Sequence, residues 1–540
     1  MELKHLLILV LMAGATGASA QHANDTVLKG ATIEVLQSYK PQVKQAPKPE
    51  WVPQLPQPDT SHPVFIYDVP QQTLYYTYTS QPLRPLALGN DVQAQPFANY
   101  IKAGGGNLST VFLDAGIGGI HGDNYETAIH LHHLSQAGNI KYQQSSLSGI
   151  EADGTWHSDF SDWHASIAGE RNQYYYYGYN HGVYNYDDAD SVKQTYTTVR
   201  LCVDTKSRDS TTAFSYHPAI MASLYDARFG SKETNFGFNA PVAYKIDDNL
   251  DAQVAVNADV AHLSTNLTSS NNAIGELIPG LRVHTNNFSG HALVGLALGK
   301  GGSGSLLPDL LVAFTIPKTK FTISAGWQAS LRQNTYEQLT TENPYLASNY
   351  NVMQTRRDEV FGNIQGTIGN HLSFSGRVSN WKYNELPTFV ADTLGDHKDF
   401  NVIYDNVNAL SVQLAARYQM AKVWSAGVSY DIYHFYNGSL PYVYGEPGTK
   451  IKGDFTVLLL SKLTVTAYLA VLNGIYGRDG FRHDMKLDPM VDLGGSAEYE
   501  VIKRLSFFVQ LDNLLNDKYQ RWPGYEGYGL NVYGGLRFKF

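Results

Sequence analysis

The final residues of the chain alternate almost perfectly between apolar and polar side chains. The polar side of this segment holds Asn531, Tyr533 and the charged residues Arg537 and Lys539. A period of two is the pattern of a β-strand with one apolar and one polar face. The apolar positions are Leu530, Val532, Leu536, Phe538 and Phe540. The terminal segment is therefore expected to be a strand whose apolar face meets a nonpolar environment.

The same alternation recurs upstream, at residues 372–378, 463–471 and 505–511. One such strand would fit a half-buried sheet in a soluble protein equally well, because those sheets also alternate. Repetition over much of the chain instead predicts a large sheet with one polar face. The residues that we expect on that polar face are Arg377, Thr464, Thr466, Arg537 and Lys539.

The connections between these strands alternate between short and long. Short turns are expected at 318–320, 369–370, 421–422, 461–462 and 503–504. Long polar and aromatic connections are expected at about 330–357, 380–406, 433–450, 473–487 and 513–529. This sorting is typical of outer-membrane barrels, whose periplasmic turns are short. The pattern predicts an all-β fold, a transmembrane antiparallel β-barrel of about 20 strands (roughly 16 to 22) over residues 96–540, with its terminal apolar face toward lipid.

The beginning of the chain reads as a secretory signal peptide. Lys4 precedes an apolar run at 6–12, and Ala-Ser-Ala follows at 18–20, so residues 1–20 are expected to be removed. Half of the 22 prolines lie before residue 97. Proline blocks both helix interiors and central strands, so 21–95 is expected to be an extended arm. Its apolar pieces favour an arm that enters or caps the barrel, in the periplasm or the lumen.

Composition narrows the alternatives. Charged residues make up 16% of the chain, below the roughly 25% usual for soluble domains, and there are 37 tyrosines. Aromatic girdles at the two membrane interfaces would account for that excess. Cys202 has no second cysteine with which to form a disulfide, and a net charge of −9 gives no electrostatic reason to expect nucleic acid as a partner.

Two segments hold residues that could carry chemistry. His130 and His132 share a strand face and His133 follows them, but two histidines on one face do not complete a metal site. The segment 156–164 contains His, Ser and Asp, yet a catalytic triad is recognised by geometry and no supporting motif is present. We therefore expect polar wall residues and a turn, with no catalytic, cofactor or metal site, and a protein that is not an enzyme.

Two tyrosine-rich clusters admit a choice between ligand binding and membrane anchoring. The first is Tyr174 to Tyr177 with Tyr179, and the second lies between Tyr433 and Tyr444 in an expected loop. Aromatic rings stack on sugars and heterocycles, but they also anchor barrels at the interface without any ligand. The anchor is the simpler interpretation of both clusters, and neither identifies a substrate.

The C-terminal half, roughly residues 250–540, resembles the barrel of TonB-dependent outer-membrane receptors in the form common among Bacteroidota. The similarity lies in 497–522, which contains Asn-Leu-Leu-Asn-Asp-Lys-Tyr at 513–519, and in the final strand 533–540. Residues 342–346 and 386–389 look like loop elements of the same kind of protein. The resemblance implies an integral barrel in the outer membrane of a Gram-negative cell, surrounded by its lipids, and a transport function.

One departure from that family concerns its N-terminal plug domain. Those receptors carry a plug of over a hundred residues and a TonB box, whereas only about 75 Pro-rich residues precede the first strands here. A folded plug does not fit, and this argues against TonB-coupled uptake. Residues Thr32, Ile33, Glu34 and Val35 resemble a TonB box faintly, and so short a peptide often matches by chance.

Two functions remain open at this point. The barrel could pass a solute through a lumen that the arm partly occludes. Alternatively, it could be a structural or assembly barrel that holds periplasmic partners or lipoproteins in an outer-membrane complex. Transport is favoured by the resemblance alone, which is an argument by association.

Overall fold

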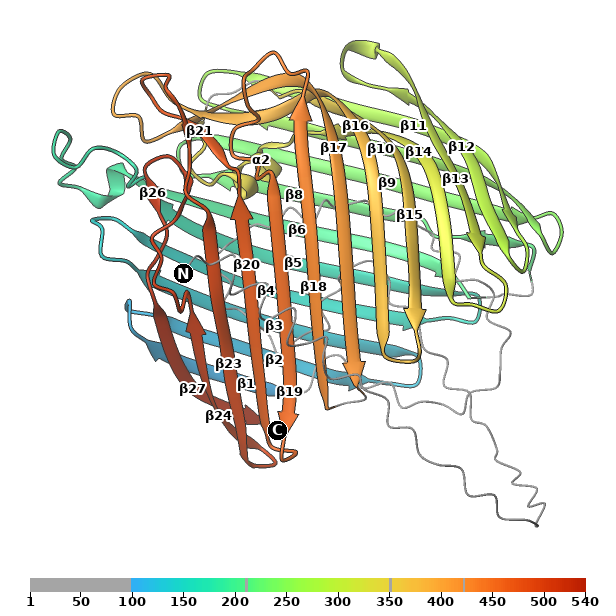
Figure 1. Cartoon of the computed structure of the whole chain (residues 1–540), viewed down its shortest axis with the longest axis horizontal. Helices are drawn as coiled ribbons and strands as arrows, with labels where there is room; N and C mark the ends of the chain where they lie inside the picture. The colour runs from blue at the N-terminus through green and yellow to red at the C-terminus, as the bar shows by residue number, and fades with distance from the viewer. Residues whose placement is uncertain (1–98, 209–211, 349–351, 421–422) are drawn as a thin grey trace, which may run out of the picture. The chain divides into compact units, whose positions relative to one another are not determined.

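The computed structural model describes residues 99–540, apart from 209–211, 349–351 and 421–422. The predicted signal peptide, the arm 21–95 and the TonB-box-like residues lie outside this part of the chain, as does the turn at 421–422. The described residues form one large antiparallel sheet and several long loops (Figure 1).

The main sheet contains 23 strands. The short strand β7 (Phe214–Tyr216) and the strand β8 (Ala219–Ala227) pair with successive parts of β9 and together act as one strand of the wall. The closed barrel therefore has 22 strands around its circumference. The other strands of its first half are β1 (Tyr100–Gly106), β2 (Val111–His121), β3 (Tyr125–Ala137), β4 (Gln144–His157), β5 (Ser161–Tyr175), β6 (Lys193–Ser207), β9 (Ser231–Lys245), β10 (Leu250–Ser264), β11 (Ser269–His284) and β12 (Phe288–Leu298).

The second half of the barrel includes the two longest strands, β16 (Leu372–Ala391) and β17 (Phe400–Met420). Its other members are β13 (Gly304–Thr315), β14 (Phe321–Gln333), β15 (Gln354–Ile368), β18 (Trp424–Tyr436), β19 (Thr449–Leu459), β20 (Leu463–Asn473), β23 (Met490–Ile502), β24 (Leu505–Asp512) and β27 (Asn531–Lys539). The remaining elements lie in loops and comprise η1 (Ala189–Ser191), η2 (Lys300–Gly302), α2 (Tyr336–Glu342), β21 (Tyr476–Arg478), β22 (Asp484–Lys486), β25 (Gln520–Trp522) and β26 (Tyr525–Glu526).

The sheet closes because its first and last strands pair with one another. Tyr100 lies opposite Lys539 and Gly106 lies opposite Tyr533, so β1 and β27 form a continuous antiparallel ladder. Closure leaves no unpaired edge, which is what lipid requires of a membrane-spanning sheet. The prediction of a transmembrane antiparallel barrel is confirmed, with a strand number inside the expected range.

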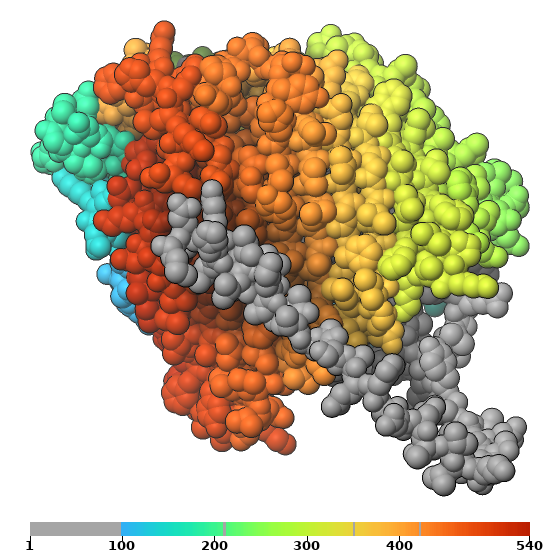
Figure 2. Space-filling view, in the orientation of Figure 1, coloured from blue at the N-terminus to red at the C-terminus, as the bar shows by residue number. Residues whose placement is uncertain are grey.

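Each strand presents one polar and one apolar face. On β15, the alternating residues Val360, Ile364 and Ile368 are 44–56% exposed, whereas Glu359 and Thr355 on the opposite face are buried. Large apolar side chains with this exposure recur around the barrel, and they form the surface that meets lipid. Figure 2 shows the outer wall that the neighbouring strands build in the second half of the chain.

The two ends of the barrel differ in their connections. We call the end that contains 369–371, 460–462, 503–504 and the C-terminal residue the turn end, and the opposite end the loop end. The short turns that the sequence predicts at 318–320, 369–370, 461–462 and 503–504 all lie at the turn end. The longest connections lie at the loop end. The expected loop at 380–406 is largely wrong, because β16 and β17 pair as far as Ala391 and Phe400 and leave only 392–399 between them.

Among the described residues, no helix is long and apolar enough to span a membrane. The α-helix α2 lies within the long connection between β14 and β15, at the loop end of the barrel (Figure 1).

Candidate functional site: a loop cap over a polar lumen wall

Three connections at the loop end, residues 176–192, 334–353 (apart from 349–351) and 513–530, pack together into one buried cluster. A fourth connection, residues 392–399, borders this cluster through hydrogen bonds from Tyr525 and Tyr186. We call the four connections together the loop cap. The cluster includes residues from these loops and from the strand ends beside them: Tyr177, Tyr196, Tyr225, Tyr336, Leu339, Leu346, Val352, Phe389, Phe400, Trp522 and Tyr525. Tyr336, Leu346 and Phe400 have no exposed surface. The loops therefore fold as a packed unit.

Stacked and edge-on tyrosines form the centre of the loop cap. The rings of Tyr345 and Tyr525 are stacked with centroids 3.5 Å apart, and Tyr177 meets Tyr525 edge-on at 4.9 Å. Each such aromatic pair contributes about 0.5–1.5 kcal/mol beyond the area that it buries. Two of these hydroxyl groups are hydrogen-bonded, because Tyr177 donates to the Glu526 carbonyl and Tyr525 donates to the Lys398 carbonyl. The contacts join four loops that are far apart in sequence.

The helix α2 is held against the strands on the polar side of the wall. Thr335 caps its N-terminus, and the carboxylate of Glu233 on β9 accepts from the backbone N–H groups of Tyr336 and Glu337 at 2.6 and 3.3 Å. Glu337 in turn pairs with Arg200 of β6. An acidic side chain at a helix N-terminus is favourable because it satisfies amide groups without partners and meets the positive end of the helix dipole.

Two glycines allow two of the cap loops to touch through their backbones. A Cβ atom at Gly524, whose φ is +85°, would lie 2.5 Å from the Gly178 carbonyl oxygen. A Cβ atom at Gly178 would lie 2.3 Å from the ring of Tyr525. Only glycine fits such an approach, and φ near +85° also disfavours other residues. The loops 176–192 and 513–530 are thus closely fitted at this contact.

A charged cluster fastens the edge of the loop cap. Lys398 binds Asp396 at 3.0 Å and lies 3.9 Å from Asp399, while the Tyr186 hydroxyl donates to Asp396. Burial raises the pKa of Asp399 to about 6, in spite of the neighbouring ammonium group. Burial alone would lower the pKa of Lys398, but its two aspartates raise that pKa overall. The loop cap therefore contains a carboxyl group that titrates near neutral pH.

The polar face near the barrel seam carries buried ions that are paired. Glu498 of β23 meets Arg537 of β27 at 3.3 Å and Lys102 of β1 at 3.9 Å. On the next strands, Tyr100 donates to Asp114, whose second oxygen lies 2.9 Å from His130 Nε2. Breaking one partner of a buried pair is costly because it leaves an isolated charge. This network ties the first strand to the last.

The structure places the sequence-predicted residues as follows. Successive register pairs put Arg377, Thr464, Thr466, Arg537 and Lys539 on the same, polar face of the sheet. Arg377 pairs with Glu359 at 2.5 Å, and Lys539 lies 3.7 Å from Glu500. On the terminal segment, Leu536, Phe538 and Phe540 are 45–54% exposed, whereas Leu530 and Val532 are partly buried.

The two motifs considered for chemistry lie on the neighbouring strands β3, β4 and β5. His130 and His132 have ring centroids 5.6 Å apart, and His133 bonds to Ser148. No group of three or more metal-ligating side chains occurs among the described residues. The segment 156–164 forms the ends of β4 and β5 and the turn between them, and His157 pairs there with Asp162 at 2.7 Å.

The anchoring interpretation of the first tyrosine cluster is wrong. Tyr175, Tyr176, Tyr177 and Tyr179 are only 3–8% exposed, and they pack inside the loop region rather than against lipid. In the second cluster, Tyr433 lies in β18 rather than in a loop as expected, and Tyr444 is buried. Part of the tyrosine excess thus serves the loop cap. Glycines beside the tyrosines, such as Gly178 and Gly524, were the sequence signal for close packing.

Comparison with known proteins supports the fold. No protein-family model and no curated protein matches the sequence. Solved structures match over 82% of the chain: the FrpB iron transporter from Neisseria meningitidis (F5-1 variant), with 10% identity, 82% of its chain covered and a TM-score of 0.62; the pyoverdine outer membrane receptor FpvA from Pseudomonas aeruginosa PAO1, with 10%, 78% and 0.61; and the copper transporter OprC, with 10%, 80% and 0.59. The chain shares the barrel fold of these receptors, as the sequence resemblance implied.

Proposed function

We propose that this protein is an outer-membrane transport barrel in which the loop cap controls passage of a solute through the lumen. The observation that carries this proposal is the loop cap itself, in which loops from distant parts of the barrel bury Tyr336, Leu346 and Phe400 completely. Barrels of this strand number have lumens wide enough to need an internal obstruction. A folded outer obstruction would serve a transporter, since an open lumen would leak.

The polar wall supports the same proposal. We infer that Arg377, Thr464, Thr466, Arg537 and Lys539 face the lumen, where charged and hydroxyl groups would line an aqueous path. Their apolar counterparts on the terminal strand, from Leu530 to Phe540, would face lipid. The neighbours FrpB and OprC are described as iron and copper transporters and FpvA as a pyoverdine receptor, which favours transport for this fold without naming a solute here.

We further propose that the loop end faces the cell exterior and the turn end faces the periplasm, as in other outer-membrane barrels. The arm 21–95 would then act from the periplasmic mouth or the lumen. Coupling to TonB through Thr32 to Val35 forms no part of the proposal.

Recording in planar bilayers tests this function. We expect full-length protein to show small, infrequent openings, and protein lacking 21–95 to conduct more, since one of two obstructions is removed. Solute flux into liposomes should change in the same order. Electrically silent barrels in both forms would contradict transport.

Affinity purification from native membranes provides the discriminating control. A silent barrel that brings down a stoichiometric lipoprotein or periplasmic protein would favour the structural role instead. Recovery of the protein in the soluble periplasmic fraction would contradict both functions.

A further inference from the structure

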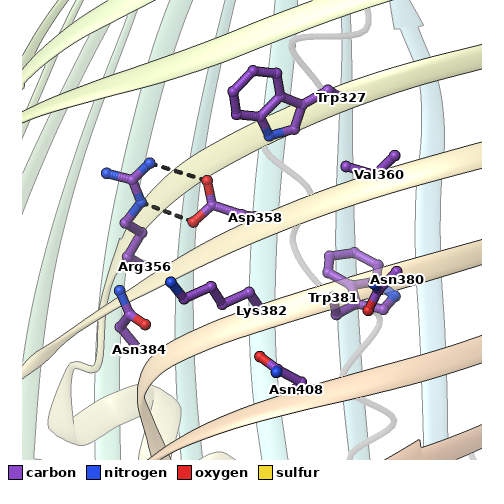
Figure 3. Close-up of a pocket in the computed structure, with 9 residues that line it drawn as sticks. All are labelled: Trp327, Arg356, Asp358, Val360, Asn380, Trp381, Lys382, Asn384 and Asn408. Atoms are coloured by element: carbon purple, nitrogen blue, oxygen red, sulfur yellow. Dashed lines mark hydrogen bonds and ion pairs between the residues drawn. The ribbon is translucent and has the colours of Figure 1, made fainter.

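A polar pocket lies in an unexpected place, on the lipid-facing side of the wall near the loop end (Figure 3). Its volume is about 590 Å³. The lining residues come from β14 to β17 and include Trp327, Arg356, Asp358, Lys382, Asn384 and Asn408. On β15, Arg356 and Asp358 alternate in step with Val360, Ile364 and Ile368, whose exposure marks the lipid-facing side. The register then places Asn384 and Lys382 opposite Arg356 and Asp358.

The pocket sits at the upper border of the apolar belt. Val360 on β15 and Leu410 on β17 are 56% and 47% exposed and lie one step closer to the turn end than the charged residues. Trp327, opposite Val360, is also exposed, at 44%. Tryptophan prefers the headgroup level of a bilayer. The pocket is therefore at the depth where lipid headgroups begin.

Its charge favours an anion. Arg356 holds Asp358 through two hydrogen bonds of 2.8 and 3.0 Å, so that carboxylate is already neutralised. Lys382 lies opposite Asp358 and Asn408 in the ladder, but within the described part of the chain no carboxylate pairs with it. The three ionic side chains of the pocket, Arg356, Asp358 and Lys382, therefore carry a net charge of one positive unit. The Tyr436 hydroxyl donates a hydrogen bond to the side-chain oxygen of Asn380. The NH₂ group of Asn380 is then the part of this amide that is offered to a ligand as a donor.

We propose that this pocket binds a phosphate group of a lipid in the leaflet at the loop end. An ammonium group surrounded by amide donors suits phosphate oxygens, and a cavity of this size admits a headgroup but not a folded partner. Acyl chains would continue downward along the exposed Val360 and Leu410. With the orientation of the proposed function, that leaflet is the outer one, so the occupant is a phosphorylated glycolipid.

Native mass spectrometry of the full-length protein in detergent tests the proposal, with lipid A, phosphatidylglycerol and inorganic phosphate as separate probes. We expect wild type to retain lipid A, and Lys382→Ala to bind it about tenfold more weakly, because hydrogen bonds to charged groups contribute on that order. Lys382→Arg should restore binding. Lys232→Ala is the matched control, since Lys232 is exposed near the loop end of β9 and already paired with Asp226.

Unchanged lipid A binding by Lys382→Ala would overturn the proposal, and so would inorganic phosphate binding as strongly as the lipid. Stronger binding of phosphatidylglycerol than of lipid A would overturn the outer-leaflet assignment and point to the inner one. Heat-modifiable gel migration reports whether each variant is folded. Conductance is recorded separately, so failure of lipid binding and failure of transport are distinguishable.

Discussion

The loop end and the turn end of this barrel are made from the same strands but use their connecting residues differently. At the turn end, connections such as 369–371 and 460–462 simply reverse the chain, using backbone conformations with positive φ at Gly369, Leu460 and Ser461. At the loop end, the connections carry the buried aromatic residues of the loop cap. No comparable cluster occurs at the turn end among the described residues.

The loop-end connections are longer and more aromatic than closure of the barrel requires. A hairpin turn needs two to five residues, and longer loops add an entropic cost of ordering unless they gain contacts. In the loop cap that cost is offset by buried tyrosines and by fitted glycines such as Gly178 and Gly524. Specific function in a rigid scaffold is usually placed in such loops.

The largest expected effect concerns orientation, because labelling is all-or-none. Epitope tags placed in 437–448 or 479–483, the loop parts of the expected connections 433–450 and 473–487, should bind antibody on intact cells. Tags at 369–370 or 503–504 should bind only after the outer membrane is permeabilised. The physical reason is that short turns face the periplasm in outer-membrane barrels. The reverse labelling pattern would refute the assignment of the two ends.

Removing one central ring should open the loop cap while the barrel stays intact. Tyr525→Ala deletes the ring stacked on Tyr345 and the hydroxyl that binds the Lys398 carbonyl. We expect a local loss of about 3–5 kcal/mol, typical of a large aromatic side chain removed from a core. Hydrogen exchange should accelerate across 176–192 and 513–530. Tyr499→Ala, an exposed tyrosine near the turn end, should leave that exchange as in wild type.

A pair of glycine variants compares the two ends directly. Gly524 and Gly369 both have positive φ, but a Cβ atom at Gly524 would meet Gly178, whereas one at Gly369 meets nothing within 4 Å. Gly369→Ala should cost only about 1–2 kcal/mol of backbone strain. Gly524→Ala should add a steric clash and separate the two cap loops. Equal thermal shifts for both variants would mean that the close contact at Gly178 contributes nothing.

The pH dependence of the loop cap should be smaller and have a defined sign. The pKa of Asp399 is about 6 in the fold and lies near 3.9 when unfolded. A raised folded pKa favours the protonated form, so this stabilisation is complete below pH ~4 and is lost as pH rises through about 6.

Hydrogen exchange in 392–399 should therefore quicken between pH 5 and 8 by up to about tenfold, beyond its intrinsic pH dependence. Solvent screening of the partly exposed carboxyl group makes the actual increase smaller than this. Asp399→Asn keeps a neutral side chain and should remove this extra dependence. If the variant retains the wild-type profile, another group controls the loop cap.

The fold could be predicted from sequence further than the site could. Alternation in segments such as 463–471 identifies two-faced strands, because the side-chain period of a strand is fixed at two. The loop cap was not predictable in the same way, since Tyr177, Tyr345 and Tyr525 are far apart in the chain and meet only after closure. Residues 386–389 illustrate the limit: they look like a loop, yet they continue β16, and Phe389 packs into the loop cap.

Conductance of loop-cap variants in planar bilayers tests the central claim most directly. The double variant Tyr345→Ala/Tyr525→Ala, in otherwise full-length protein, removes both stacked rings and should open more often and to larger currents than wild type. Tyr499→Ala serves as the control and should record as wild type does. A double variant whose hydrogen exchange shows an open loop cap, but whose current equals that of wild type, would contradict control of passage by the loop cap.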